Sequence, residues 1–444
     1  MKFSELIQHL GGTGERWNSG VRLKSDGPVL GLTPRLREVR PGMAYFALPE
    51  ADDADPCATQ TACQRGASLV VCGPGVAIPS RTPAIRVQNP GAALAAAAAA
   101  FRNFPARQLQ ILPVTGDPSL RRGVAFVLAG ILNALGVPTA CLGGHGYLVA
   151  GRLGSTPLNR LNAAEVQGLL GQLVAAGGRC VVAEFDAAEF PAGLDGVHFS
   201  RPTSVSHPAV FRHSRPVMLS PRGSRVEFHE PTPGTIATTP LIGQRSLLAL
   251  DLAWMEAVAV AKSLGHSPAA VRNTLPILPP IHGWLEPVQC GQPFGVFVDR
   301  ATTAEELEAA LRDARQLTTG KLSVICGPRA TASRKDNAAL GAVAIAFADH
   351  VWYTADNPRD RSIPALLAEM PGSGARPGRG VYVENDRSTA LRRCIRSAQR
   401  GDVIVVAGKA DAPFQEIDRT IIPFDDRVVA AQALHSRGYV GGRS

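Results

Sequence analysis

From near Val288 to its end, the chain alternates short apolar runs with helix-like segments, and this alternation constrains the fold more than any other feature. Apolar runs occur at Gly295–Asp299, Leu322–Cys326 and Val403–Ala407. Segments with helical periodicity, such as Glu305–Leu317, lie between them. Continuous apolar strands that alternate with helices are typical of a parallel sheet covered on both faces. The sequence therefore predicts an α/β fold for this part.

The two preceding parts of the chain show the same logic. Before residue 105, Met43–Leu48 is a strand-like run within a small α/β pattern. Further on, an apolar strand at Leu109–Val114 precedes a loop at Thr115–Gly123 and a helix at Val124–Leu135, the start of a βαβ unit. A chain of 444 residues is too long for one ordinary core. We expect three domains, with boundaries at 1–105, 106–287 and 288–444.

Composition excludes several classes of protein. The net charge of +9 allows nucleic-acid binding as a hypothesis, but the charges are spread out and aromatics make up only 5%, so we expect no nucleic-acid partner. The eight cysteines lack CxxC spacing, which favours reduced, mostly buried thiols. No apolar run reaches membrane-spanning length, and Met1–Leu10 carries charges that a signal peptide lacks. We expect a cytoplasmic protein without a membrane partner.

Several short motifs follow one another in a characteristic order. They are Val39–Leu48, Val114–Gly116, Ser155–Pro157, Ala183–Phe185, Gly283–Glu286, Val298–Ala301, Asp356–Arg359, Ala407–Lys409 and Phe424–Arg427. Over nearly the whole chain this order resembles the Mur ligase family. Asp356-Asn357-Pro358-Arg359 is the most specific motif, and it resembles that of the tripeptide synthetases that use diaminopimelate.

The resemblance implies an α/β protein with the three-domain Mur ligase architecture. The family has an N-terminal UDP-binding domain, a central P-loop-type ATPase domain with a parallel sheet, and a C-terminal dinucleotide-fold-like domain. Its members use ATP and Mg²⁺ to phosphorylate a carboxylate, and an incoming amine attacks the acyl phosphate.

The phosphate loop departs from the family pattern. Family members read Thr-Gly-Thr-Asn-Gly-Lys-Thr-Thr, whereas this chain reads Thr115-Gly116-Asp117-Pro118-Ser119-Leu120-Arg121-Arg122. The lysine is replaced by leucine, both hydroxyls by arginines, and Pro118 removes a backbone donor. These are the groups that hold triphosphate and magnesium. We therefore expect ATP and Mg²⁺ binding to be lost. Nucleotide-site remnants are Thr115, Gly116, Arg121, Arg122 and Asp299.

The roles of Arg121, Arg122 and Glu184 are each open to more than one interpretation. Arg121 or Arg122 could supply a substitute cation, but the simpler interpretation is two solvated arginines that open a helix. Glu184 stands where the family has a metal-linked glutamate. A lone carboxylate at a strand end is more often solvated or a cap, so no metal site is predicted, and Glu184 is only a remnant of the catalytic set.

The motif for the amino-acid acceptor matches the family pattern more closely than the phosphate loop does. The resemblance assigns acceptor-binding roles to Asp356, Asn357, Arg359 and Gly408, with Arg359 gripping a distal carboxylate. Ala412 replaces the glutamate that completes the family site. The competing interpretation is a loop in which Asn-Pro simply initiates a turn.

Two functional hypotheses follow. The first is a non-catalytic Mur-ligase-like protein with a scaffold, regulatory or precursor-binding role. Its candidate partners are another Mur ligase or a second copy of the chain, and its candidate ligands are a cell-wall precursor or an amino acid. The alternative is a divergent ATP-dependent amide ligase in cell-wall or secondary metabolism, with Arg121 or Arg122 in place of the lysine.

Overall fold

The computed structural model describes residues 1–10, 27–48, 57–78, 83–143, 146–149, 152–154, 161–184, 203–205, 211–229, 231, 233–372, 380–409, 414–418 and 420–440. These form two compact units. The first comprises Met1–Ala125 and Gly136–Ser206, and the second comprises Phe126–Leu135 and His207–Ser444. The three-domain boundaries stay a prediction. The motif Ser155–Pro157, Phe185 and Ala412 lie outside the described residues.

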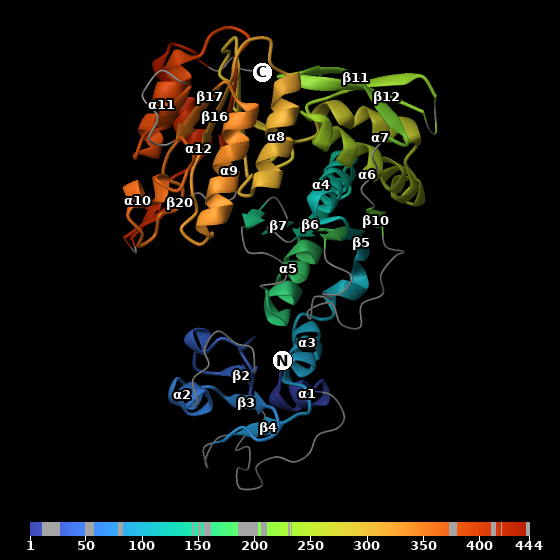
Figure 1. Cartoon of the computed structure of the whole chain (residues 1–444). Coiled ribbons are helices and arrows are strands. Elements are labelled where there is room, and N and C mark those ends of the chain that lie inside the picture. The colour runs from blue at the N-terminus through green and yellow to red at the C-terminus, as the bar shows by residue number, and fades with distance from the viewer. Residues whose placement is uncertain are drawn as a thin grey trace. The chain divides into compact units, whose positions relative to one another are not determined.

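The first unit begins with a four-stranded parallel sheet in the order β1-β2-β3-β4 (Figure 1). One face packs against the first and third helices and the other against the second. The third helix starts with Pro90 at its first turn, where the Asn89 side chain accepts from the amide of Ala92. The elements are α1 Phe3–Gln8, β1 Gly31–Thr33, β2 Met43–Ala47, α2 Ala58–Gln64, β3 Leu69–Cys72, β4 Ala84–Arg86 and α3 Pro90–Phe101.

A six-stranded sheet follows in the order β10-β5-β9-β6-β7-β8. Its first four strands are parallel, and β7 and β8 add an antiparallel edge. The predicted loop at 115–123 is wrong: the helix begins at Pro118 because proline suits a first helical turn and Asp117 caps it. The elements are β5 Gln110–Gly116, α4 Pro118–Ala134, β6 Thr139–Gly143, β7 Gly146–Val149, β8 Arg152–Gly154, α5 Ala163–Ala175, β9 Cys180–Glu184 and β10 Thr203–Val205.

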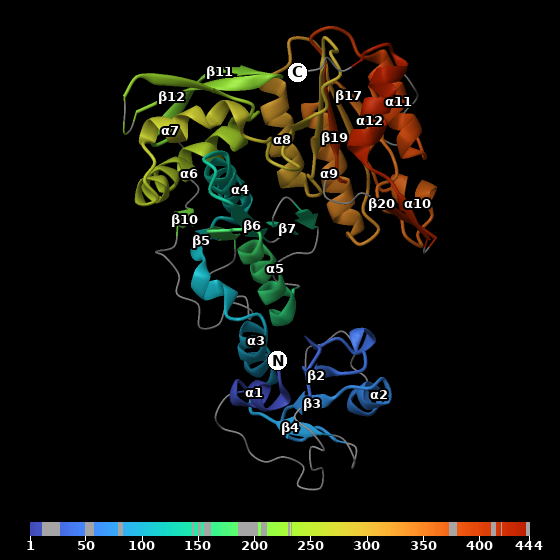
Figure 2. The same ribbon diagram turned by 180° about the vertical axis from the view of Figure 1, so that it is seen from behind.

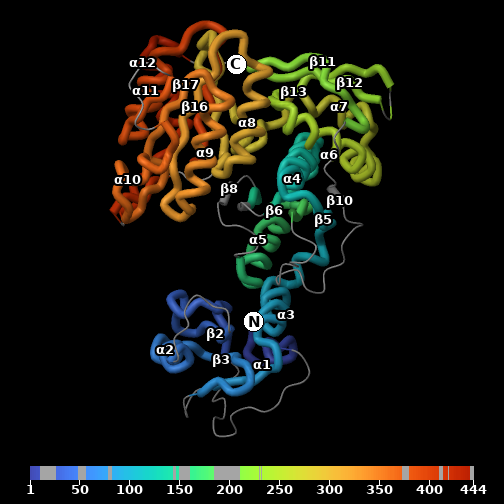
Figure 3. The backbone as a smooth tube through the Cα atoms, in the orientation of Figure 1, coloured from blue at the N-terminus to red at the C-terminus, as the bar shows by residue number. Residues whose placement is uncertain are grey.

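The second unit contains a three-stranded antiparallel sheet and two helices (Figure 3). Buried Asp251 fixes the start of this sheet, since its carboxylate accepts from the amides of Arg212 and His213 at 2.9 and 2.8 Å. Phe228 and Trp254 stack beneath the strands. The elements are β11 Ser214–Ser220, β12 Gly223–Phe228, β13 Thr235–Thr239, α6 Gln244–Ser263 and α7 Pro268–Asn273.

The predicted parallel sheet of the C-terminal part is confirmed, with strand order β14-β15-β19-β16-β17-β18 and only β14 antiparallel. Helices α8 and α9 cover one face, and α11 and α12 cover the other (Figures 1 and 2). The elements are β14 Glu286–Pro287, β15 Gly295–Asp299, α8 Ala304–Gln316, β16 Leu322–Cys326, α9 Arg334–Phe347, β17 His350–Tyr353, α10 Ile363–Leu367, β18 Val381–Val383, α11 Arg387–Ser397, β19 Val403–Ala407, β20 Phe414–Ile417, β21 Thr420–Pro423 and α12 Asp426–Ser436.

Candidate functional site

In the turn between β5 and α4, the side chain of Asp117 hydrogen-bonds to the first turn of the helix. Gly116 ends β5 with φ +101°, and Asp117 follows directly. One Asp117 carboxylate oxygen accepts from the Ser119 amide at 2.8 Å and from the Ser119 hydroxyl at 2.6 Å. A helix N-terminus attracts anions through its unpaired amides and its dipole. At the N-terminus of α4, the anion that these amides attract is therefore the protein's own Asp117 carboxylate.

Arg121 pairs with Glu184 across this turn. The Nε atom lies 3.2 Å from a Glu184 carboxylate oxygen, and Nη1 donates to the carbonyl of Gly116 at 3.2 Å. The side chains are only 14% and 5% exposed, so the prediction of a solvated Arg121 and a solvated or capping Glu184 is wrong. The reason is tertiary: parallel pairing of β5 with β9 brings the end of one strand beside the end of the other.

Neighbouring residues shape the surroundings of Glu184. A Cβ atom on Gly143 would lie 2.5 Å from a Glu184 carboxylate oxygen, so a side chain at the end of β6 would displace that carboxylate. Burial and the charge of Glu184 raise the pKa of Cys141 to about 12, and the charge of Arg122 opposes them. Cys141 is consequently a neutral, unreactive thiol at physiological pH. Arg122 contributes positive charge to the same region.

The Asp-Asn-Pro-Arg loop follows β17, and the buried ammonium of Lys409 contacts two of its side chains. Asp356 is buried, with a carboxylate oxygen 3.7 Å from the Lys409 ammonium. The Asn357 side-chain oxygen accepts from that ammonium at 3.2 Å and from the Glu416 amide at 3.0 Å. Gly408 has φ +114° and would place a Cβ 3.3 Å from Asp356, so only glycine fits there. Asp356, Asn357 and Gly408 are thus brought together as expected.

Arg359 is in the left-handed region, with φ +53°, and is paired internally. Its amide donates to the Glu416 carbonyl at 2.8 Å, and its Nε lies 3.2 Å from a Glu416 carboxylate oxygen. Its side chain is half-exposed. The group expected to hold an acceptor carboxylate therefore already contacts a carboxylate of the chain.

A fully buried ion pair supports this loop from within the sheet. Arg387 contacts both carboxylate oxygens of Asp426, at 2.8 and 2.7 Å, and donates to the carbonyl of Ala407 at 2.8 Å. Burial raises the pKa of Asp356, although the charges of Arg387 and Lys409 oppose it. Burial also lowers the pKa of Lys409. These charged residues fix the Asp-Asn-Pro-Arg loop to β19 and α12.

Asp299, the remaining nucleotide-site remnant, belongs to the second unit and is fully buried. One of its carboxylate oxygens accepts from the amide of Leu285 at 3.0 Å and from the guanidinium of Arg245 at 2.9 Å. Arg245 also stacks on the ring of Trp284, 4.4 Å from its centroid. Trp284 replaces the arginine of the family motif, and the neighbouring guanidinium comes from α6 instead.

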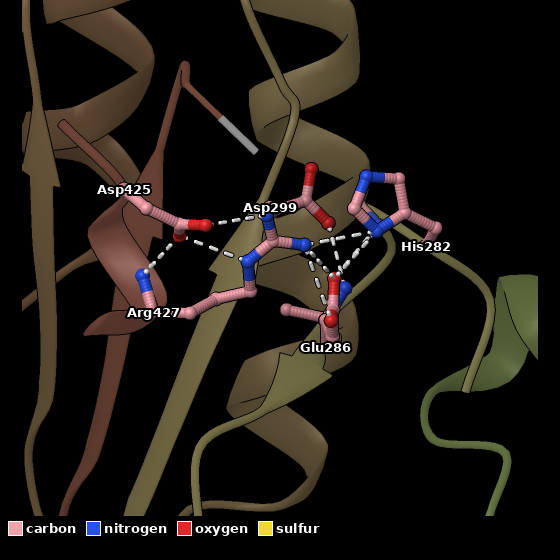
Figure 4. Close-up of polar contacts among 7 residues, drawn as sticks. His282, Glu286, Asp299, Asp425 and Arg427 are labelled. Carbon is pink, nitrogen blue, oxygen red and sulfur yellow. Dashed lines mark hydrogen bonds and ion pairs between the residues drawn. The ribbon is translucent and has the colours of Figure 1, made fainter. Parts of the chain in front are cut away.

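Around Asp299 lies a second polar network, formed by His282, by Glu286 at the start of β14 and by the residues that begin α12 (Figure 4). The Nδ1 atom of His282 is 3.1 Å from a Glu286 carboxylate oxygen and 3.1 Å from Arg427 Nη1. Arg427 also forks onto Asp425 at 2.9 and 2.8 Å. Burial favours a higher pKa for Glu286, but His282 and Arg427 outweigh it, so the pKa lies below its ordinary value.

Sequence reasoning missed the residues that satisfy these sites internally, namely the capping role of Asp117, the ion pairs of Arg245 and Glu416, and the buried Lys409. Only Asp117 carried a local signal, because an Asp-Pro-Ser run is typical of a helix start. The other contacts join residues 52 or more positions apart. All eight cysteines lie within the described ranges, none of them forms a disulfide, and six are buried.

The fold and these sites define a class of protein: a multi-sheet α/β protein with a turn between β5 and α4 at the position of a phosphate loop, and with an Asp-Asn-Pro-Arg loop after β17. Residues 285–410 match the family described as Mur ligase, glutamate ligase domain. Residues 285–410 therefore match a Mur ligase domain, and most of the chain is similar in sequence and fold to Mur ligases.

Known relatives are similar over most of their length. The chain is 26% identical to the UDP-N-acetylmuramoyl-L-alanyl-D-glutamate–2,6-diaminopimelate ligase of Solibacter usitatus, covering 93% of this chain and 94% of the relative. It is 28% identical to the ligase of that name from Streptomyces coelicolor, with 91% and 92% covered. A solved structure of a ligase of that name has a TM-score of 0.58 at 18% identity, covering 95% and 99% of the two chains. No helix within the described ranges is long and apolar enough to cross a bilayer.

Proposed function

We propose that this chain is a Mur-ligase-like protein that does not catalyse ligation, and that it has a scaffold, regulatory or precursor-binding role. The observation that carries the proposal is the buried ion pair between Arg121 and Glu184. In the family these positions serve the phosphates and a metal ion. Here the cation and the anion of the site neutralise each other.

Asp117 adds to the same argument. Its carboxylate accepts a hydrogen bond from the Ser119 amide at the start of α4, and a bound phosphate oxygen would need that same donor. Pro118 offers no amide, and Leu120 offers no ammonium. A triphosphate would bring negative charge against Asp117 and Glu184 with only Arg121 and Arg122 to offset it. Residues 115–122 therefore do not fit ATP with Mg²⁺.

Calorimetric titration of the full chain with Mg-ATP tests the proposal directly. We expect no saturable heat at millimolar nucleotide. A relative that keeps the lysine and both threonines of the loop serves as the positive control. Tight binding that depends on magnesium would contradict the proposal.

The alternative is a divergent ATP-dependent amide ligase. It is favoured by the Asp-Asn-Pro-Arg loop, where Asp356, Asn357 and Gly408 meet, and by the Arg121 guanidinium beside Glu184. It predicts phosphate release that depends on an amino-acid acceptor, such as diaminopimelate, and that is lost in Arg121→Ala or Arg122→Ala. The non-catalytic proposal predicts no release from the wild-type chain across a panel of acceptors.

The partners of such a protein follow from the same proposal. They would be another Mur ligase or a second copy of the chain, and co-purification with an intact ligase from the same cell is the relevant measurement. A cytoplasmic location stays a prediction of the sequence.

A further inference from the structure

The three-stranded sheet formed by β11, β12 and β13 has one buried face and one exposed face. On the buried face, Phe228 packs against Trp254 of α6, with ring centroids 4.1 Å apart, and Figure 1 shows α6 along this side of β12. The solvent-facing side of an antiparallel sheet usually carries polar residues. Here the exposed side, which we call the outer face, carries three apolar residues that are 48%, 48% and 46% exposed, namely Val217, Met218 and Ile236.

Arginines surround these apolar residues. Met218 of β11 lies opposite Arg225 of β12 in the register of the sheet. Residues 211–229 contain four arginines and one glutamate, a net charge of +3 with histidine neutral. In the described part of the chain, Glu227 is the only carboxylate that pairs with one of these arginines, at 2.5 Å from Arg215. All four arginines are exposed: Arg212, Arg215, Arg222 and Arg225.

The edges of the sheet do not favour the addition of a further strand. At the edge strand β11, Pro216 has no amide to donate, and a bulge interrupts the register between Pro216 and Met218. At the opposite edge, β13 contacts the short helix Leu275–Ile277. Edges of this kind resist pairing with another chain. A partner of this sheet therefore contacts the side chains of the outer face rather than a backbone edge.

We propose that the outer face binds an acidic amphipathic segment of another protein. The apolar side of that segment contacts Val217, Met218 and Ile236, and its carboxylates pair with the surrounding arginines. Methionine and arginine are enriched in protein–protein interfaces, and opposite charges fix the orientation of a partner. This inference rests on the proposed scaffold role and specifies the chemistry of the partner.

Two other occupants fit the outer face less well. A second copy of the chain would bring the same basic face against it, and the chain as a whole carries a net charge of +9. An anionic membrane would require apolar side chains that insert between lipids, yet the turn between β11 and β12 presents exposed Arg222. The carbonyl of Pro221 in that turn also accepts from the side chain of Gln289 at 3.2 Å, which holds the turn against the protein.

A matched pair of peptides tests the charge preference. The full chain is titrated, by fluorescence anisotropy, with a labelled helical peptide that has a leucine stripe flanked by glutamates, and with its counterpart in which the flanking glutamates are glutamine. We expect the glutamate peptide to bind about tenfold more tightly at low salt, because two or three partly exposed ion pairs together amount to roughly that factor. Added salt should reduce the difference. Equal affinities, or binding of neither peptide, would overturn the proposal.

Variants locate the peptide on the sheet. Met218→Thr combined with Ile236→Thr should weaken both peptides by about tenfold, because it removes apolar contact area, and threonine keeps a high β-propensity. Arg225→Gln should reduce the preference for the glutamate peptide. Arg392→Gln removes the same charge from the exposed surface of α11 and should change neither affinity. Undiminished binding in the double variant, with its fold checked by circular dichroism, or an equal effect of Arg392→Gln would place the peptide elsewhere.

Two further measurements address the other occupants. Sedimentation velocity that shows a wild-type dimer, converted to monomer by Ile236→Thr, would assign the outer face to a second copy and overturn the proposal. Binding to vesicles of phosphatidylglycerol and phosphatidylcholine that is lost in Ile236→Thr would assign it to a membrane, with the same consequence. The titration with Mg-ATP remains independent of both. Saturable nucleotide binding beside retained peptide binding would refute the non-catalytic proposal alone, so the two failures are distinguishable.

Discussion

Replacing Arg121 by methionine should destabilise the first unit strongly, because it removes the guanidinium that pairs with buried Glu184. Methionine keeps much of the aliphatic volume of arginine and removes the charge. Glu184 is 5% exposed and Arg121 is 14% exposed, so solvent screens this pair poorly. Removing one partner of a buried ion pair typically costs about 3–5 kcal/mol. Since Arg121 is not completely enclosed, we expect a value near the lower end, about 3 kcal/mol.

That free energy corresponds to roughly a hundredfold change in the equilibrium between protected and open states of the unit. Hydrogen exchange is the suitable assay, because two compact units need not unfold in a single two-state transition. Amide protection in β5 and β9 should fall in Arg121→Met. Protection in β15 and β19, which belong to the second unit, provides the internal reference.

The double variant Arg121→Met with Glu184→Gln isolates the charge. It removes the stranded carboxylate, so we expect it to recover about 2 kcal/mol of the loss relative to the single variant. If protection in β5 and β9 falls less than about fivefold in Arg121→Met, the pair behaves as a screened surface pair. In that case, or if the double variant is no better protected than the single one, the reasoning about a self-neutralised phosphate site is wrong.

Three further predictions concern the second unit. Glu416→Gln frees the Arg359 guanidinium and should raise the affinity for diaminopimelate by about fivefold in a calorimetric titration; unchanged or weaker binding would show that Glu416 does not compete with the acceptor. The pKa of Glu286 in the folded state lies below its ordinary value, so this group stabilises the fold above its unfolded pKa, and the stabilisation is lost as the pH falls. When the pH is lowered from about 5 to 3, the urea concentration at the midpoint of unfolding should therefore decrease in the wild type, and it should decrease less steeply in Glu286→Gln. Arg387→Met strands buried Asp426 and should cost about 3–5 kcal/mol in urea denaturation, with a loss under 1 kcal/mol as the contradicting result.

Periodic apolar runs were sufficient to predict the C-terminal sheet. Gly295–Asp299, Leu322–Cys326 and Val403–Ala407 are strands with the predicted bounds, because buried parallel strands are continuous apolar runs between helices. The start of α4 was predicted too late. The pattern of an apolar strand followed by an apolar helix predicted a loop at 115–123, whereas the Asp-Pro-Ser run is itself a helix start.

The internal partners of the site residues could not be predicted in the same way. The substitutions in the loop indicated loss of the lysine and the hydroxyls, but not that Arg121 would reach a residue 63 positions away. Strand order decides this, because β9 lies between β5 and β6 and places Glu184 beside the end of β5. Pairing of β20 with the loop after β17 similarly brings Glu416 to Arg359.

These internal contacts provide a physical explanation for the proposed loss of ligase activity. A binding site that merely lost its lysine would keep the buried charge of Glu184 with less positive charge to offset it. This is costly, and selection for stability would favour either removing the carboxylate or supplying a cation. Arg121 supplies the cation. The same argument applies at the start of α4, where Asp117 offsets the dipole that a phosphate would otherwise neutralise. Each substitution stabilises the empty site, and each makes nucleotide binding more costly, because the ligand must now displace a side chain rather than water.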